Sequence, residues 1–263
     1  MRRAFTLLEI LVCIAIVTIL MAILLPALEN VRHQGYIDKC ASNLHSIGQA
    51  LAIYANENHG AFPRTAYVPG APITFGTNPA ATDPFLAGGP VANDVTAAVF
   101  LLMRSEKMPP AVFICPYDDV IEYQADSADI DNRSNFTNEK INLGYSFADP
   151  YPDTPAVNAG YKWTASLSAD FAIAADRNPG TDLPGDDVIN VSATSAQDTL
   201  DRGNSENHEK DGQNVLFGDG HVEWERTVFC GVSGDNIFAN QNNLLNASPV
   251  TKDDSLLLPT DEQ

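Results

Sequence analysis

A run of 21 mostly apolar residues near the N-terminus, residues 5–25, constrains this chain more than any other feature. Its only charged side chain is Glu9. As a helix the run would be about 31 Å long, at about 1.5 Å per residue. That length matches the hydrocarbon core of a bilayer, which is roughly 30 Å thick. The run therefore predicts a membrane-spanning helix.

Three kinds of segment compete for this run: a cleaved secretory signal, a plain membrane anchor and a more specialised membrane helix. A secretory signal has an apolar core of about 7–15 residues followed by small residues at a cleavage site. Here the apolar run is longer, and it leads into Leu-Leu-Pro-Ala at residues 24–27, which fits such a site poorly. A plain anchor gives no reason for Glu9, because a carboxylate inside a membrane costs free energy. Glu9 therefore predicts a partner and a function.

The charges of the chain predict its orientation and limit its partners. Arg2 and Arg3 precede the apolar run, so the positive-inside rule places the N-terminus in the cytoplasm and the remaining chain outside. The formal net charge is −19, from 34 acidic and 15 basic side chains. Such a surface repels phosphate groups, so no nucleic acid is expected as a partner. With 44% hydrophobic residues, the chain is too apolar to be disordered.

The helical pattern continues past the apolar run as an amphipathic stretch. Apolar residues recur there at spacings of three and four, which is typical of a helix with one face in a protein core. These residues are Ile37, Cys40, Leu44, Ile47, Leu51 and Tyr54. Gly60 can end the helix in a left-handed conformation, and Pro63 blocks its continuation. The sequence predicts one helix over residues 5–59, with a folded domain against its second half.

The rest of the chain predicts short elements between long polar loops. Asp94 is a candidate cap for a helix over residues 95–108, which two prolines end. The predicted strands are residues 111–116, 143–147 and 171–175, and the predicted loops or turns are residues 64–93, 118–138, 176–180 and 181–212. Residues 239–263 are predicted to be a loosely attached C-terminal segment.

The clearest hairpin signal is at residues 213–225. Two apolar-rich runs flank Asp219 and Gly220, and both residue types tolerate the positive φ angles of a tight turn. In the second run Val222 and Trp224 are expected on one face and the intervening residues on the other. The sequence predicts two antiparallel strands here.

The first nine residues, Met-Arg-Arg-Ala followed by Phe-Thr-Leu-Leu-Glu, resemble the class III signal of type IV prepilins and type II secretion pseudopilins. The resemblance implies that a prepilin peptidase cuts between Ala4 and Phe5 and that the new amine of Phe5 is methylated. It also implies that Glu9, the fifth residue of the mature chain, pairs with a terminal amine during assembly, and that Pro26 bends the helix. The family prefers Gly before the cut, where this chain has Ala4.

A second resemblance covers the end of the long helix and the hairpin. Residues 39–44 and 54–63 are similar to prepilin-like proteins that also carry a C-terminal H-x9-DG motif. In this chain His208 corresponds to the His, and Asp219 and Gly220 correspond to the DG. Ten residues lie between His208 and Asp219, one more than the motif has.

Residues of metal-ligand types occur at two places in the sequence. His208, Asp219 and His221 are zinc ligand types, but no zinc-binding spacing such as HExxH accompanies them, so hydrogen-bonded or solvated side chains are expected instead. Calcium in an irregular acidic loop is a second candidate, which the resemblance implies through those pseudopilins that bind calcium in a C-terminal loop. The carboxylates at Asp126, Asp129 and Asp131 are close in sequence, but Arg133 breaks the EF-hand pattern. No cofactor is expected.

The chain has four cysteines, and its sequence lacks common catalytic motifs. Cys13 lies in the apolar run, whereas Cys40, Cys115 and Cys230 are predicted outside the cytoplasm, where a disulfide can form. Which two of these three are close is not predicted by the sequence. The sequence has no GxSxG, P-loop or GxGxxG motif, so an enzyme is not expected.

These observations predict an α+β fold in which a long N-terminal helix packs on an antiparallel sheet, as in pilins. The predicted segments are a leader (1–4), a transmembrane assembly helix (5–26), its amphipathic continuation (27–63) and an extracytoplasmic domain (64–263). The expected function is that of a structural subunit of a type IV pilus-like or type II secretion pseudopilus filament. The subunit is expected to cross the inner membrane once and, after assembly, to lie in a filament or at the cell surface. The expected partners are prepilin peptidase, sibling subunits and an assembly platform. The rival is a membrane-anchored periplasmic protein that binds a ligand.

Overall fold

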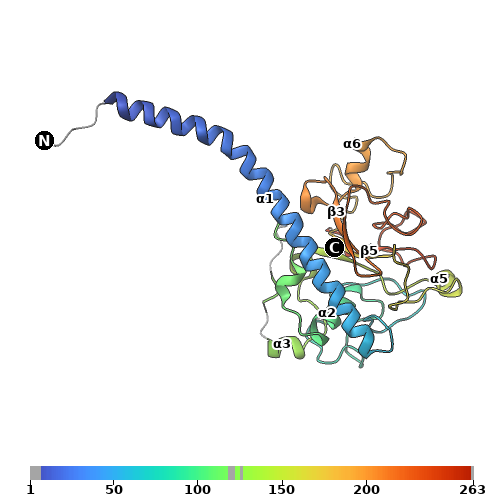
Figure 1. Ribbon diagram of the computed structural model, residues 1–263. Helices are drawn as coiled ribbons and strands as arrows, with labels where there is room; N and C mark the ends of the chain where they lie inside the picture. The colour runs from blue at the N-terminus through green and yellow to red at the C-terminus, as the bar shows by residue number, and fades with distance from the viewer. Residues whose placement is uncertain (1–6, 118–121, 125–126, 262–263) are drawn as a thin grey trace. The chain divides into compact units, whose positions relative to one another are not determined.

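The computed structural model describes residues 7–117, 122–124 and 127–261 (Figure 1). The chain divides into two compact units, residues 1–38 and residues 39–263. The elements in chain order are α1 (Leu7–Glu57), α2 (Val95–Ser105), η1 (Pro110–Phe113), α3 (Ser127–Asp131), α4 (Glu139–Asn142), β1 (Tyr145–Ala148), α5 (Thr154–Asn158), β2 (Ala172–Asp176), α6 (Gln197–Leu200), η2 (Asp201–Gly203), η3 (Glu206–His208), β3 (Gln213–Phe217), β4 (Val222–Glu225) and β5 (Leu257–Leu258).

The described part of the N-terminal unit is the first half of α1. Its apolar side chains are exposed: Leu7 by 83% and Leu25 by 61%. The most apolar window of α1 has a mean hydropathy of 3.0, and none of it is buried. Among the described residues, α1 is the one helix long and apolar enough to cross a membrane. The predicted long helix is confirmed over this part.

The second half of α1 belongs to the C-terminal unit and contributes one face to its core. Cys40, Leu44 and Ile47 are fully buried, and Leu51 is nearly so, as the helical spacing predicts. After α1, Gly60 has a φ of 87°, and its N–H donates to the carbonyl of Ala55. This left-handed residue ends the helix in the predicted way.

The described residues form one five-stranded antiparallel sheet with the order β4-β3-β2-β1-β5. Helix α1 approaches this sheet closely at Gly48, where an added Cβ would lie 2.8 Å from Cδ1 of Leu216 in β3. The small residue allows the helix to pack on the sheet (Figure 1). The α+β fold, a long helix on an antiparallel sheet, is therefore confirmed.

Among the local predictions, the cap of one helix and two strands are confirmed, whereas one strand and two loops are wrong. The side chain of Asp94 caps α2 by accepting from the N–H of Ala97, and β1 and β2 lie where strands were predicted. The predicted strand over residues 111–116 contains the end of the 3₁₀ helix η1 instead. Pro110 starts η1, where its fixed φ suits a helical first turn. The predicted loop over residues 118–138 contains the short helix α3. The predicted loop over residues 181–212 contains the short helices α6, η2 and η3.

The C-terminal segment is not loosely attached, which corrects the sequence prediction. Its leucines, Leu256 to Leu258, are fully buried, and β5 pairs with β1 at the edge of the sheet. Successive strand residues point to opposite faces. Leu257 accordingly joins the main core, whereas its two neighbours pack with Val95 and Tyr151 in a second cluster. Three consecutive leucines are therefore used because both faces of this strand are covered.

The hairpin of β3 and β4 forms as predicted, with Leu216 opposite Val222. Gly220 in its turn has a φ of 90°, and no atom lies within 4 Å of the position of an added Cβ. We therefore expect Gly220→Ala to lower the free energy of unfolding by about 1–2 kcal/mol through backbone strain alone. Gly220→Asn should cost less, because Asn tolerates this conformation better. Urea unfolding of the two variants tests this, and equal costs would contradict it.

A half-buried carboxyl near the C-terminal segment, that of Asp235, predicts a pH dependence of stability. Burial raises the pKa of Asp235 to about 7, although a hydrogen bond from the N–H of Ser255 opposes the rise; the charges of Asp254 and Asp253 add to it. In the unfolded chain an aspartate has a pKa near about 3.9. The folded protein therefore binds the extra proton between these values, and its stability falls as the pH rises from about 4 to about 7.

Asp235→Asn removes this titration. We expect the free energy of unfolding of the parent chain to fall relative to that of the Asn variant between pH 4 and pH 7, and the difference to stay constant above that range. Urea unfolding of both proteins across this range is the measurement. Parallel stability curves would contradict the prediction.

Candidate functional site

The first candidate site is the exposed apolar surface of α1 in the N-terminal unit. Glu9 lies in the first turn of this helix, where the positive end of the helix dipole favours a carboxylate. The next acidic residue on the helix is Glu29, beyond the apolar run. Glu9 is therefore one carboxylate in an exposed apolar surface, as the sequence indicates.

The predicted processing and assembly segment also includes Ala4, Phe5 and Pro26. Ala4 and Phe5 lie outside the described residues. Pro26 lies within α1, and α1 continues to Glu57. The side chain of Pro26 is not among those that the structure describes. The predicted cleavage, methylation and bend therefore stay predictions.

The residues of the H-x9-DG-like motif occupy two different places. His208 ends η3 and is fully buried. Asp219 lies in the turn between β3 and β4 with about half of its side chain exposed, and it accepts hydrogen bonds from the backbone N–H and the ring of His221. Gly220 supplies the positive φ of that turn. The motif therefore combines a turn with a separate buried histidine.

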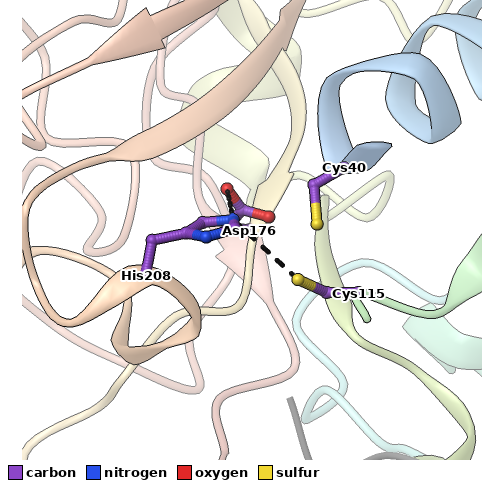
Figure 2. A group of neighbouring side chains, drawn as sticks. All are labelled: Cys40, Cys115, Asp176 and His208. Atoms are coloured by element: carbon purple, nitrogen blue, oxygen red, sulfur yellow. Dashed lines mark hydrogen bonds and ion pairs between the residues drawn. The ribbon is translucent and has the colours of Figure 1, made fainter. Parts of the chain in front are cut away.

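His208 is part of a buried cluster with Cys40, Cys115 and Asp176, which we call the Cys-Asp-His cluster (Figure 2). All four side chains are fully buried. Nε2 of His208 lies 3.3 Å from Oδ2 of Asp176 and 3.9 Å from Sγ of Cys115. One donor atom from each of the four residues lies within 4.8 Å of all the others. Four segments of the C-terminal unit thus bring four ligand-type atoms together.

The fold positions each member of the cluster from a different element. Cys40 is on the buried face of α1, and Cys115 follows η1. Asp176 is the last residue of β2, the central strand of the sheet, and lies opposite Tyr145 in β1. His208 ends η3, where Ser205 caps the short helix.

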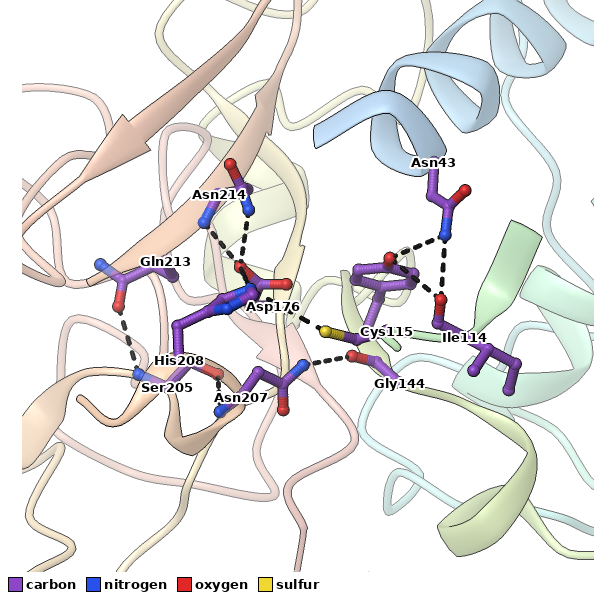
Figure 3. A network of polar contacts seen from close by, with 11 residues as sticks. Asn43, Ile114, Cys115, Gly144, Asp176, Ser205, Asn207, His208, Gln213 and Asn214 are labelled. Carbon is purple, nitrogen blue, oxygen red and sulfur yellow. Dashed lines mark hydrogen bonds and ion pairs between the residues drawn. The ribbon is translucent and has the colours of Figure 1, made fainter. Parts of the chain in front are cut away.

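Neighbouring amides hold the cluster in place (Figure 3). The backbone and side-chain nitrogens of Asn214 both donate to Oδ2 of Asp176, at 2.7 and 3.1 Å. Asn207, the residue before His208, donates to the carbonyl of Gly144 at 2.8 Å. Asn43 on α1 donates to the carbonyl of Ile114, the residue before Cys115, at 2.9 Å. The backbone on either side of the cluster is therefore fixed by hydrogen bonds.

The hydrogen bonds of the cluster shift the pKa values of His208 and Cys115 toward the charged form of each side chain. Burial acts to lower the pKa of His208, but its hydrogen bonds to Asp176 and Cys115 raise it to about 9. The pKa of Cys115 falls to about 7, first through its interaction with the thiol of Cys40, against the effect of burial, and then through His208. The same interaction and burial raise the pKa of Cys40. Cys115 is therefore the more acidic thiol of the two.

The sequence left the partners of Cys40, Cys115 and Cys230 open, and the structure brings the first two together. Cys230 lies outside the cluster and is partly buried. The cluster itself could not be found from spacing, because Cys115 and His208 alone are 93 residues apart in the chain. The available signals were the position of Asp176 directly after the predicted strand over residues 171–175 and the presence of His208 in the motif.

Two of the three acidic residues that were candidates for calcium, Asp129 and Asp131, have basic partners. Asp129 accepts from Nε of Arg133 at 2.8 Å, and Asp131 pairs with Lys107. Asp126 lies outside the described residues. A second acidic group, formed by Asp186, Glu206 and Asp261, includes carboxylates that pair with the amine of Lys210.

Comparison with known proteins identifies the N-terminal segment. Residues 1–25 match the prokaryotic N-terminal methylation motif. No curated protein and no solved structure matches the chain. The match covers the apolar run, Glu9 and the two residues of the predicted cleavage site, Ala4 and Phe5. The N-terminal segment of the chain is therefore prepilin-like.

Proposed function

We propose that the chain is a structural subunit of a type IV pilus-like or type II secretion pseudopilus filament. The observation that carries the proposal is a methylation motif at residues 1–25 that runs into an exposed apolar helix, followed by a separately folded unit. The chain acts by assembly, and catalysis is not part of the proposed role. Prepilin peptidase is the first proposed partner, cutting between Ala4 and Phe5 and leaving a methylated amine on Phe5.

Assembly then moves the apolar helix from lipid into a bundle of similar helices. Lipid tails are as apolar as leucine, so the bundle is stabilised by close packing and by polar contacts between helices. The carboxylate of Glu9 provides such a contact with the terminal amine of Phe5 on a neighbouring subunit. A buried pair of charges is favourable only when both groups meet, so this contact sets the stagger between subunits.

The proposed location is the inner membrane, with the N-terminus in the cytoplasm and the acidic C-terminal unit outside. Arg2 and Arg3 support this orientation through the positive-inside rule. An inner-membrane assembly platform and sibling subunits are the further proposed partners. Nucleic acid is not a proposed partner, because a net charge of −19 repels phosphate groups.

A membrane-anchored periplasmic protein that binds a ligand is the second candidate function. It uses the same apolar helix as an anchor, and the separately folded C-terminal unit favours it. The two functions differ at Glu9, because an anchor alone functions equally well or better with an apolar residue there.

Processing by prepilin peptidase tests the proposal. Co-expression with an active peptidase is expected to give a mature chain that lacks residues 1–4 and begins with methylated Phe5, as read by intact mass and N-terminal peptides. Ala4→Gly should be processed at least as fast, and Ala4→Leu should block cleavage. Ala22→Leu, a similar enlargement inside the apolar run, should leave processing unchanged. With an inactive peptidase, the chain should keep Met1. A chain that also keeps Met1 with an active peptidase would contradict the proposal.

A further inference from the structure

We infer that the Cys-Asp-His cluster is a structural zinc site of the C-terminal unit. The cluster contains two thiols, one carboxylate and one imidazole, which are the three ligand types that Zn²⁺ takes in proteins. Structural zinc sites are four-coordinate and closed to solvent. Four buried donors from four chain segments fit that description (Figure 2).

The distances between donor atoms are close to those of a tetrahedral zinc site. Zinc bonds of about 2.0–2.1 Å to nitrogen and oxygen and about 2.3 Å to sulfur place a nitrogen and an oxygen ligand about 3.3 Å apart. The same bonds place a nitrogen and a sulfur ligand about 3.6 Å apart. Nε2 of His208 lies 3.9 Å from Sγ of Cys115. Its distance of 3.3 Å to Oδ2 of Asp176 places the carboxylate, whose other oxygen Oδ1 has no donor among the described residues, beside the same metal position. Since the four donor atoms lie within 4.8 Å of one another, small side-chain movements are enough to form the site.

The carboxylate of Asp176 supplies an independent indication. Its Oδ2 accepts from both nitrogens of Asn214, whereas its buried Oδ1 accepts no hydrogen bond from the described residues. Figure 2 shows this second oxygen on the side of the two cysteines. A buried carboxylate oxygen without a donor costs free energy unless a cation or donor meets it. Zinc at the centre of the cluster removes that cost.

The polar shell around the cluster has the form expected of a metal site. Ligands are held by hydrogen bonds to second-layer groups, which fix their orientation. Asn214 holds Asp176, Asn207 fixes the chain beside His208, and Asn43 fixes the chain beside Cys115 (Figure 3). The ligands are therefore pre-positioned by a network that a pair of cysteines alone would not need.

Zinc in this position would join four segments of the C-terminal unit. It would tie the second half of α1, through Cys40, to the chain after η1, to the end of β2 and to η3. Since a preformed site is absent from the unfolded chain, the binding free energy would add to the stability of this unit. The metal would thus hold the helix on the sheet.

Metal titration of the full chain in detergent micelles tests the inference. The protein is first reduced and stripped with a chelator, and Co²⁺ is then added as a spectroscopic substitute for zinc. We expect one Co²⁺ per chain, with the intense visible absorption of a tetrahedral site and a charge-transfer band from thiolate. Zn²⁺ should displace the Co²⁺ and raise the melting temperature of the stripped protein.

Variants assign the ligands. Cys115→Ser and His208→Gln should each weaken Co²⁺ binding by about tenfold or more. Cys230→Ser and His221→Gln are matched controls, since the thiol and imidazole that they remove lie outside the cluster, and both should bind as the parent does. Unchanged binding in Cys115→Ser would overturn the inference.

A second measurement needs no variant, in case the substitutions prevent folding. Zn²⁺ is expected to protect Cys40 and Cys115 of the parent chain from alkylation, while the reaction of Cys230 stays unchanged. Absence of a cobalt spectrum in the reduced protein would overturn the inference. A disulfide between Cys40 and Cys115 in protein taken directly from native membranes would overturn it as well, since two sulfurs bonded to each other cannot both bind zinc as thiolates.

Discussion

Replacing Glu9 with Leu is expected to abolish incorporation of the chain into filaments while leaving it in the membrane. The substitution makes the apolar run uninterrupted, so insertion becomes more favourable. It also removes the carboxylate that the proposed assembly needs opposite a neighbour's terminal amine, which would then be left unpaired among apolar helices. The measurement is the amount of the chain in assembled filaments against the amount in membranes, by quantitative blotting.

Glu29→Leu is the matched control, because Glu29 lies on the same helix beyond the apolar run and is exposed. This variant should assemble like the parent. Glu9→Leu that assembles normally would contradict the proposed contact and favour the anchored ligand-binding protein. Loss of both variants from the membrane would contradict the assignment of residues 5–25 as the span.

Replacing Gly144 with Ala is expected to lower the free energy of unfolding of the C-terminal unit by about 2–3 kcal/mol. An added Cβ would lie 2.5 Å from the backbone nitrogen of Cys115, so the backbone itself must move. Hydrogen bonds hold Gly144 on both sides: its N–H donates to Phe113 at 2.9 Å, and its carbonyl accepts from Asn207 at 2.8 Å. Relief of the clash therefore disturbs contacts beside the Cys-Asp-His cluster.

Urea unfolding of the full chain in micelles measures this change. Both tryptophans of the chain, Trp163 and Trp224, lie in the C-terminal unit, so their fluorescence reports on its unfolding. Gly35→Ala is the control: it lies within α1, with no atom within 4 Å of an added Cβ, and Ala favours a helix. An equal response of the two variants would contradict the packing described around Gly144.

The sequence predicted the parts of the fold that depend on local patterns. The spacing of Cys40, Leu44 and Ile47 is a property of one helix, and that helix buries the predicted face. Asp94 caps α2, and the Asp219-Gly220 turn joins β3 to β4, because capping and tight turns involve only neighbouring residues.

The features that the sequence missed depend on contacts between distant segments. Strand β5 looked like part of a loose tail, because a two-residue strand has no periodicity and its burial comes from β1 and a second cluster. The Cys-Asp-His cluster is assembled from four elements, and only His208 belonged to a recognisable motif. Asp176 was predicted in a turn, but it is the buried last residue of β2.

Photo-crosslinking in native membranes tests most directly whether the chain assembles through its N-terminal helix. A crosslinking amino acid replaces Ile16, which is exposed on α1 within the apolar run, and a second variant carries it at Leu183, an exposed position in the C-terminal unit. We expect Ile16 to give adducts with this chain or with another chain carrying a methylation motif, and Glu9→Leu to abolish them. Adducts from Ile16 with lipid alone, in cells where filaments assemble, would contradict assembly through the N-terminal helix.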